Sequence, residues 1–491
     1  MNVLHRRSVS LAAACVLVVA ACGGSTPSSS PPAAATNNAT TVPPTVVVAT
    51  PTAQQTTGAT TTPTSPATSV VPSVPAESVT PTATACTPAT PPAAPSSKVT
   101  LNLWIFEGED QIVPTFISDF QSTHPNIELK ETLVPEDLYS TKMETAFAAG
   151  TPPDIAFVYN PTWMKAGDFL PINDLMASNC VDISQFAQTA LSSCQVNDTL
   201  YCIGSYTGLY VLYYDKSLFD AAGLSYPSGT TGMSVDTYAQ LASQLAKPNS
   251  DLSKRIWGAT TGGPEADVDN RDFVSPDGKT ASGYFDSAAN INTFAKLAHM
   301  ANDGSGLSWD DIASMGVDDA FELMKTHQLA MTPDDNTALP NLEAAGIDVG
   351  VAPPFKEQDS DPFWIPMWTD AWGVTTKSAH PDEAKQFLTW VATEGQKVRA
   401  DSGALPLNIQ YATQIDWAGS DPGKQDMVTM AEMGRPFLFV PGFADNLSPI
   451  IDDTWNQVVN DEANAESIMH SQVQVFQTQL TQDWATWDSI Q

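Results

Sequence analysis

The folded part of the chain opens with alternating extended and helical hydrophobic patterns. Residues 99–106, 127–134 and 155–159 have extended patterns of strand length. Between them, 112–120 and 139–147 carry apolar residues at helical spacing. Strand, helix, strand, helix, strand within about 60 residues predicts a parallel sheet whose crossovers are right-handed.

The same alternation continues toward the C-terminus. Further strands are expected at 210–214, 256–260, 329–332 and 348–352, and further helices at 217–222, 235–246, 291–300 and 381–391. The last of these helices opens with Pro381, followed by Asp382 and Glu383, which suit the positive end of the helix dipole. Alternating elements throughout predict an α/β protein.

The carboxyl ends of parallel strands are where ligands bind in open sheets. Glu107 and Glu109 follow the first predicted strand, and Tyr159, Asn160 and Trp163 lie at the end of the third. These five side chains are therefore the first candidates for a binding site.

The N-terminus has the pattern of an export signal. Arg6 and Arg7 precede an apolar stretch, 8–21, which ends in Ala20-Ala21-Cys22. This is a lipobox, so we expect 1–21 to be a lipoprotein signal peptide and Cys22 to be lipidated; an ordinary signal peptide is the alternative. No later segment reaches about 18 uninterrupted apolar residues, so the protein is expected at the cell membrane, lipid-anchored and facing the extracytoplasmic side.

Residues 22–97 are expected to be a disordered tether. The stretch is rich in proline and threonine, and Glu77 is its only charged residue. Such a segment cannot bury enough apolar surface to offset its ordering entropy. The remaining 394 residues exceed what one hydrophobic core usually supports, so two lobes are expected.

Charge excludes one class of partner. The formal net charge is −34, which disfavours nucleic acid and anionic lipid surfaces, so no nucleic-acid partner is expected. No cofactor is indicated, and the histidines are scattered without metal-ligand spacing, so no metal site is expected either.

Four cysteines remain in the exported chain and favour disulfides in an oxidising compartment. Asn197 and Asp198 are turn formers, and a three-residue turn ending at Thr199 would place Cys194 opposite Cys202. We therefore expect Cys194–Cys202. Pairing of Cys194 with Cys180 is the alternative, and the partners of Cys86 and Cys180 stay open.

Several short motifs occur in a familiar order from 98 to 491. They include Leu101-Asn102-Leu103-Trp104, Gly150-Thr151-Pro152-Pro153-Asp154, Tyr213-Tyr214-Asp215-Lys216, Gly350-Val351-Ala352-Pro353, His380-Pro381-Asp382-Glu383-Ala384 and Gly403-Ala404-Leu405-Pro406. In this respect the chain resembles the extracellular solute-binding proteins of sugar ABC importers, the family of the maltose-binding protein.

The resemblance implies two lobes that close over a ligand as a hinged clamp. It implies two or three crossing segments, expected near 205–209, 367–372 and 436–443. The first lobe would comprise 98–207 plus 373–436 and the second 208–368 plus 437–491. The implied partners are a carbohydrate and the ABC importer permease subunits, with the protein itself a monomer held at the membrane only by its lipid anchor.

One position departs from the family pattern. Members often carry Gly-Pro-Trp after the Met-Thr strand, and that tryptophan stacks on a sugar ring. Here the stretch is Met331-Thr332-Pro333-Asp334-Asp335-Asn336-Thr337, so Thr337 stands where the tryptophan would be. A polyol, peptide or polyamine therefore remains an alternative ligand.

A sugar site needs carboxylates or amides for paired hydroxyls and flat aromatic rings for the apolar faces. Side chains of these kinds occur at the predicted strand ends and crossings. The candidate ligand-binding residues are Glu107, Glu109, Tyr159, Asn160, Trp163, Tyr206, Asp334, Asp335, Asn336, Trp368, Asp370, Trp372 and Arg435.

The main rival class is a secreted glycoside hydrolase, because paired carboxylates near tryptophans would serve it too. Glu107 and Glu109 lie on one loop, however, whereas a catalytic acid and base must flank a bond from opposite sides. Motifs of serine hydrolases and zinc proteases are absent from the sequence. We therefore expect a binding protein and no enzyme; a structural wall lipoprotein is the other rival.

Overall fold

The computed structural model describes Cys86, Pro95, 97–106, 112–261, 273–317, 319–356, 365–436 and 438–490. The expected signal peptide, Cys22, nearly all of the expected tether, Glu107 and Glu109 lie outside these residues. In the described part of the chain, no helix is both long and apolar enough to cross a membrane.

The first sheet has the order β2-β1-β3-β13-β6. Strand β1 (Val99–Phe106) pairs in parallel with β2 (Ile127–Val134) and with β3 (Ile155–Phe157), and helices α1 (Val113–Thr123) and α2 (Glu136–Ala149) connect them. This is the parallel arrangement that the hydrophobic pattern predicted. We call this sheet and the helices packed on it the first lobe.

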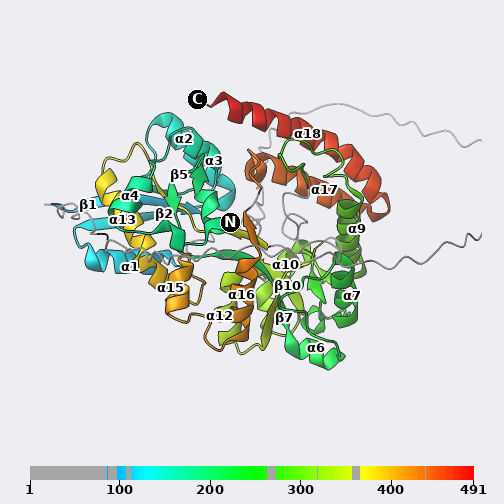
Figure 1. Cartoon of the computed structure of the whole chain (residues 1–491). Coiled ribbons are helices and arrows are strands. Elements are labelled where there is room, and N and C mark those ends of the chain that lie inside the picture. Colours follow the sequence, from blue (N-terminus) through cyan, green and yellow to red (C-terminus); the bar gives the residue numbers. More distant parts are fainter. Residues whose placement is uncertain are drawn as a thin grey trace, which may run out of the picture. The chain divides into compact units, whose positions relative to one another are not determined.

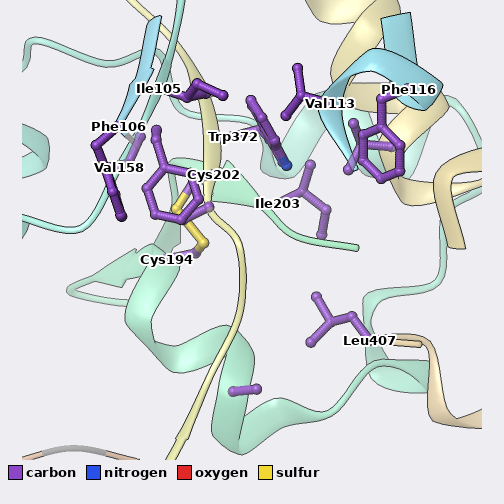
Figure 2. Packing of buried hydrophobic residues seen from close by; sticks show 14 of the residues in the cluster. Ile105, Phe106, Val113, Phe116, Val158, Cys194, Cys202, Ile203, Trp372 and Leu407 are labelled. Carbon is purple, nitrogen blue, oxygen red and sulfur yellow. A yellow bond between two sulfur atoms is a disulfide. The ribbon is translucent and has the colours of Figure 1, made fainter. Parts of the chain in front are cut away.

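Two strands from distant parts of the chain complete the first sheet. Strands β13 (Trp372–Val374) and β6 (Cys202–Ile203) run antiparallel to their neighbours, and α13 (Pro381–Ala392) packs on β13. Figure 2 shows Trp372, Phe116 and Ile203 in this core. The Trp372 ring lies 5.9 Å from that of Phe157, centroid to centroid, in an edge-on contact.

The second sheet has the order β10-β7-β12-β14, and β11 also pairs with β7. Its central strand β7 (Gly208–Asp215) is buried at every residue, as a strand covered on both faces requires. Around it lie β10 (Met331–Asp335), β11 (Val349–Ala352), β12 (Ile365–Trp368) and β14 (Gly434–Pro436). We call this sheet and its helices the second lobe.

The helices of the second lobe gather around α9 (Ala288–Asp303), which contacts α7 (Val235–Leu245), α17 (Ser448–Asn460) and α18 (Ala465–Ser489) (Figure 1). Apolar residues of all four helices share one buried cluster with β7. The C-terminal helices are thereby tied to the second lobe.

Shorter elements fill the connections. They are α3 (Pro161–Lys165), α4 (Asn173–Ser178), α5 (Gln188–Leu191), β4 (Gln195–Val196), β5 (Thr199–Leu200), α6 (Lys216–Ala222), β8 (Ala259–Thr260), β9 (Gly306–Leu307), α10 (Trp309–Met315), α11 (Ala320–Met324), α12 (Leu339–Ala344), α14 (Glu394–Asp401), α15 (Ile409–Gln414), α16 (Pro422–Glu432) and the π-helical turn η6 (Phe443–Leu447).

Two short segments lead from one sheet to the other. Residues 204–207 join β6 to β7, and 369–371 join β12 to β13. The two segments touch so closely that a Cβ atom at Gly204 would lie 1.8 Å from the Thr369 Oγ1 atom. Only glycine fits at that position, because real Cβ contacts are not that short.

The third expected crossing, 436–443, differs from what the sequence analysis placed there. Strand β14 pairs with β12 in the second sheet, and η6 contacts α17 and α18. The segment therefore joins two parts of the second lobe. Helix α16 also packs on β11, so 422–436, which was expected in the first lobe, lies with the second sheet.

Two disulfides hold the first lobe. One joins Cys194 to Cys202, the pair expected of a hairpin, and is visible in Figure 2. Its turn has two residues, not three, because Val196 pairs with Thr199 and the intervening residues both have positive φ, as in a tight hairpin turn. The other disulfide joins Cys86 to Cys180.

Candidate functional site

The first group of candidate residues lies where the two crossing segments meet. The Tyr206 hydroxyl accepts a hydrogen bond from Trp368 Nε1 at 3.1 Å and donates one to Asp335 Oδ2 at 3.4 Å. Tyr206 comes from the first crossing, Trp368 from the end of β12 and Asp335 from the end of β10. The structure thus brings together two aromatic rings and a carboxylate that the sequence had placed in one site.

The backbone around these rings is tightly packed. A Cβ atom at Gly208 would lie 2.5 Å from Trp368 Nε1, so glycine is required for the indole to lie against β7. Tyr206, Tyr210, Trp368 and Ala404 form a separate small buried cluster.

Asp335 is almost fully buried, with 3% of its surface exposed. Loss of hydration raises the pKa of its carboxyl group, the hydrogen bond from Thr337 lowers it, and the neighbouring Asp334 raises it again. Asp334 Oδ1 accepts a hydrogen bond from the Asp335 amide at 2.6 Å. A carboxylate in such a setting is suited to accept hydrogen bonds from neutral hydroxyl donors.

The Asn336 side chain forms hydrogen bonds with backbone groups. Its Oδ1 accepts from the Leu209 amide at 3.0 Å, and its Nδ2 donates to the Thr207 carbonyl at 3.1 Å. The side chain therefore fixes the end of β10 against the first crossing.

A second group lies directly behind the first and is centred on Asp370. Its carboxylate accepts from the Ser205 amide at 2.6 Å, from Trp372 Nε1 at 2.9 Å and from an Arg399 terminal nitrogen at 3.1 Å. The Arg399 guanidinium also lies 4.6 Å from the centroid of the Tyr206 ring. We call Ser205, Asp370, Trp372 and Arg399 the hinge network.

The hinge network changes the interpretation of two candidates. Asp370 and Trp372 are each 1% exposed, and their polar atoms are engaged with each other and with the crossing segments. Asp370 is paired with the Arg399 cation, and Trp372 bonds to Asp370, so these side chains position the crossings. Tyr206, Asp335 and Trp368 are also buried, but they bond to one another through neutral donors and not to a cation.

A third group lies at the carboxyl end of β3. Tyr159 is half-buried and its hydroxyl shares a hydrogen bond with the Ser140 hydroxyl. Asn160 caps α3 by accepting from the Thr162 amide at 2.9 Å, and its Nδ2 donates to Asp445 Oδ2 at 3.0 Å. Ser140 Oγ donates to Asp445 Oδ1 at 2.7 Å.

The two remaining candidates are Trp163, whose ring contacts that of Tyr159 edge-on at 5.3 Å between centroids, and Arg435. Trp163 is 3% exposed within the first-lobe core, and its Nε1 is buried without a hydrogen-bond partner among the described residues. Arg435 is exposed on β14, where its backbone pairs with Pro366.

Sequence reasoning missed Arg399, Ser140 and Asp445. Arg399 lies on α14, a helix with few apolar residues that the sequence analysis did not predict. Asp445 precedes α17 by a few residues and belongs to the Pro-Gly-Phe-Ala-Asp-Asn stretch that follows β14. Its place directly after an expected crossing was the available signal.

A groove among the described residues lies elsewhere. It has a volume of about 690 Å³, runs beside α2 on the first lobe and is lined mainly by apolar side chains, among them Trp104, Val134 and Leu138. None of the candidate ligand-binding residues lines it. In the described part of the chain, no cluster of His, Cys, Asp or Glu could hold a metal ion.

Comparison with proteins of known sequence finds relatives that bind sugars and a polyol. A multiple sugar-binding protein of Streptococcus mutans is 21% identical over 329 residues, which cover 63% of this chain and 74% of that protein. A mannitol-binding protein of Pseudomonas aeruginosa is 23% identical over 304 residues, 56% of this chain and 64% of that protein.

Solved structures of binding proteins have a similar fold. An ABC substrate-binding protein of Listeria monocytogenes in complex with cycloalternan matches with a TM-score of 0.66 at 17% identity, over 78% of this chain and 100% of that one. A maltose/maltodextrin-binding domain of Bdellovibrio bacteriovorus bound to maltotriose matches with a TM-score of 0.62 at 18% identity, over 78% and 100%. The fold is thus the two-lobed clamp of periplasmic binding proteins.

The family model of the bacterial extracellular solute-binding proteins matches residues 106–398, more than half of the chain. The match includes both crossing segments together with Tyr206, Asp335 and Trp368. The chain belongs to the bacterial extracellular solute-binding protein family.

Proposed function

We propose that this protein captures a sugar or oligosaccharide between its lobes and delivers it to the permease of an ABC importer. The observation that carries the proposal is the group of Tyr206, Asp335 and Trp368 at the meeting point of the crossings. In a clamp, a ligand bound beside the crossings contacts both lobes at once.

The chemistry of the group suits a sugar. A carboxylate accepts hydrogen bonds from hydroxyls, and an indole or phenol ring covers the apolar C–H face. Burying about 80 Å² on one ring is worth roughly 2 kcal/mol at ~25 cal/mol per Å². Micromolar affinity requires about 8 kcal/mol, which two such contacts and several hydrogen bonds supply.

A polyol is the second candidate ligand. The mannitol-binding relative supports it, and so does Thr337, which stands where many family members carry a stacking tryptophan. A small open-chain polyol needs fewer stacking surfaces than an oligosaccharide does.

The proposal includes a role without catalysis, because the family comprises binding proteins.

The proposal also includes lipidation at Cys22, with 22–97 as the tether and the protein facing the extracytoplasmic side. Replacement of Cys22 by serine should release the protein or leave it unprocessed. Unchanged palmitate labelling of that variant would rule out this anchor.

The experiment that tests the function is a thermal-shift screen of the released Cys22→Ser protein against sugars and polyols. A ligand at 100 times its dissociation constant should stabilise the fold by about 2.7 kcal/mol. Asp335→Asn should weaken the response at least tenfold in concentration, whereas Asp401→Asn, an exposed acid on α14, should not. The proposal fails if no member of the panel shifts the transition, or if the purified protein consumes the sugar that binds.

A further inference from the structure

Side chains of the two lobes contact each other directly on the side of η6 and α18. Asp445, in η6 of the second lobe, accepts hydrogen bonds from Ser140 at 2.7 Å and from Asn160 at 3.0 Å. Ser140 lies on α2 and Asn160 caps α3, so both donors belong to the first lobe. One carboxylate thus receives two donors from elements more than 280 residues earlier in the chain.

A second contact joins the same two parts of the molecule. Lys165, the last residue of α3, donates from Nζ to the Trp487 carbonyl at 2.5 Å. Its ammonium group also lies 4.3 Å from the centroid of the Trp487 ring, within the range of a cation–π contact. Trp487 lies in the last turn of α18 and packs against Phe439 at 4.5 Å between ring centroids.

Both contacts are made between protein groups alone. Each polar group involved has a protein partner, so no solute is needed to satisfy it. From this geometry we infer that Ser140, Asn160 and Lys165 of the first lobe, with Asp445 and Trp487 of the second, form a clasp that favours the closed clamp before any solute is bound. This inference rests on the proposed clamp function and adds a determinant of its resting conformation.

The setting of the clasp suits a contact that must be made and broken. Asp445 is exposed and Lys165 and Trp487 are half-buried, so opening the clasp returns all three to water without creating a buried unpaired charge. Two carboxyl groups interact with the Asp445 carboxylate: Glu144 from the first lobe and Asp483 from the second. Tyr159 of the first lobe donates a hydrogen bond to it. Repulsion between Asp445 and Glu144 acts across the lobes and weakens the clasp.

The effect is expected to be a shift of population. Hydrogen bonds to a charged group and a partly exposed cation–π contact together change a two-state equilibrium by roughly three- to thirtyfold. Removal of either contact should therefore increase the open fraction measurably and leave the fold of each lobe intact.

The test measures the distance between the lobes in the full mature chain without added sugar. Two spin labels are introduced through non-natural residues, so that both disulfides stay intact, at Ser122 on α1 and Gln240 on α7, which are both exposed. Asp445→Ala and Lys165→Met should each move part of the distance distribution toward longer distances, and the double variant should move more of it.

The matched control is Asp453→Ala, an exposed acid on α17 that bonds only within its own helix region, to Gln457. It should leave the distribution as in the unaltered protein. Thermal unfolding shows whether each variant folds. If Asp445→Ala does not fold, the distance distribution of Lys165→Met alone tests the clasp. Distributions that stay unchanged, or shift to shorter distances, overturn the clasp. Failure of every sugar to bind would overturn the proposed function but would leave these ligand-free distances as a valid test.

Discussion

The hinge network and the clasp both join the two lobes through an aspartate, yet they are built in opposite ways. Asp370 is 1% exposed and receives five or more hydrogen bonds, including those from Ser205, Trp372 and Arg399. Asp445 is exposed as a residue, although its neighbours remove part of the hydration of its carboxyl group, and it receives hydrogen bonds from Ser140 and Asn160. The first aspartate is enclosed in the fold and the second lies at its surface.

This difference follows from the cost of dehydrating a charge. A buried carboxylate is tolerated only when it is paired and its lone pairs are satisfied, so losing one partner is strongly destabilising. A crossing segment held in this way has one well-defined conformation. An exposed carboxylate exchanges protein donors for water at little cost, which permits repeated opening and closing. The crossing segments therefore keep one conformation, whereas the contacts of the clasp can form and break as the lobes close and open.

The largest expected difference between the two regions is in the free energy of unfolding when each aspartate is replaced by alanine. Asp370→Ala should lower the free energy of unfolding by about 3–5 kcal/mol, because it removes the carboxylate partner of the buried Arg399 guanidinium. Asp445→Ala should change it by no more than about 1 kcal/mol. Urea unfolding followed by tryptophan fluorescence measures both. Equal effects would show that burial does not separate the two regions.

A double-mutant cycle isolates the buried pair. Asp370→Asn with Arg399→Met should give a coupling energy of about 1–3 kcal/mol, because the two groups share a dehydrated site. Lys397 and Asp401 on the same helix form an exposed ion pair and are the matched control. Their cycle should give little or no coupling. A larger value for the exposed pair would contradict the argument.

Two tyrosines extend the comparison to hydroxyl groups. Tyr206→Phe removes the acceptor of the buried Trp368 N–H, so the free energy of unfolding should fall by about 1–3 kcal/mol. Tyr159→Phe removes a hydroxyl at a half-buried site and should cost less, about 0.5–1.5 kcal/mol. Thermal unfolding of the two variants side by side checks the order, and the reverse order would be evidence against the distinction.

The fold was largely predictable from local pattern. The runs at 99–106 and 127–134 became β1 and β2 with the same bounds, because apolar residues that point into the core alternate with more exposed positions along much of each strand. Strands β13 and β6 were not predicted as neighbours. Their pairing joins segments about 170 residues apart, and no local pattern encodes which sheet a short strand enters.

The sequence allowed us to predict which residue types lie in the site and at which strand ends, but not what each side chain binds. Asp370 has the same sequence signature whether it binds a hydroxyl or an arginine, and its partner Arg399 lies on another element. The position of Asp445 beside Ser140 depends on how the two lobes sit, which neither segment encodes alone. Trp487 of the C-terminal helix likewise contacts Lys165 only through that arrangement.

The smallest expected effect is a pH dependence of the clasp, and its sign follows from Asp445. In the closed form, loss of hydration raises the pKa of this carboxyl group, although hydrogen bonds from Ser140, Asn160 and Tyr159 lower it. In the open form the group is hydrated and its pKa returns toward the ordinary value of about 3.9. The closed form thus holds the proton more tightly.

Closure therefore takes up protons, and the closed fraction should rise as the pH falls toward the aspartate range. Loss of hydration and the charge of Asp445 also raise the pKa of Glu144, which adds to the effect with the same sign. Between pH 7 and pH 5 we expect the ligand-free distance distribution to shift modestly toward the closed form. Asp445→Asn should remove most of that shift, because its amide does not titrate, whereas Asp453→Asn should preserve it. A closed fraction that falls on acidification would mean that the hydrogen bonds to the ionised carboxylate outweigh its dehydration, and that the clasp is strongest at neutral pH.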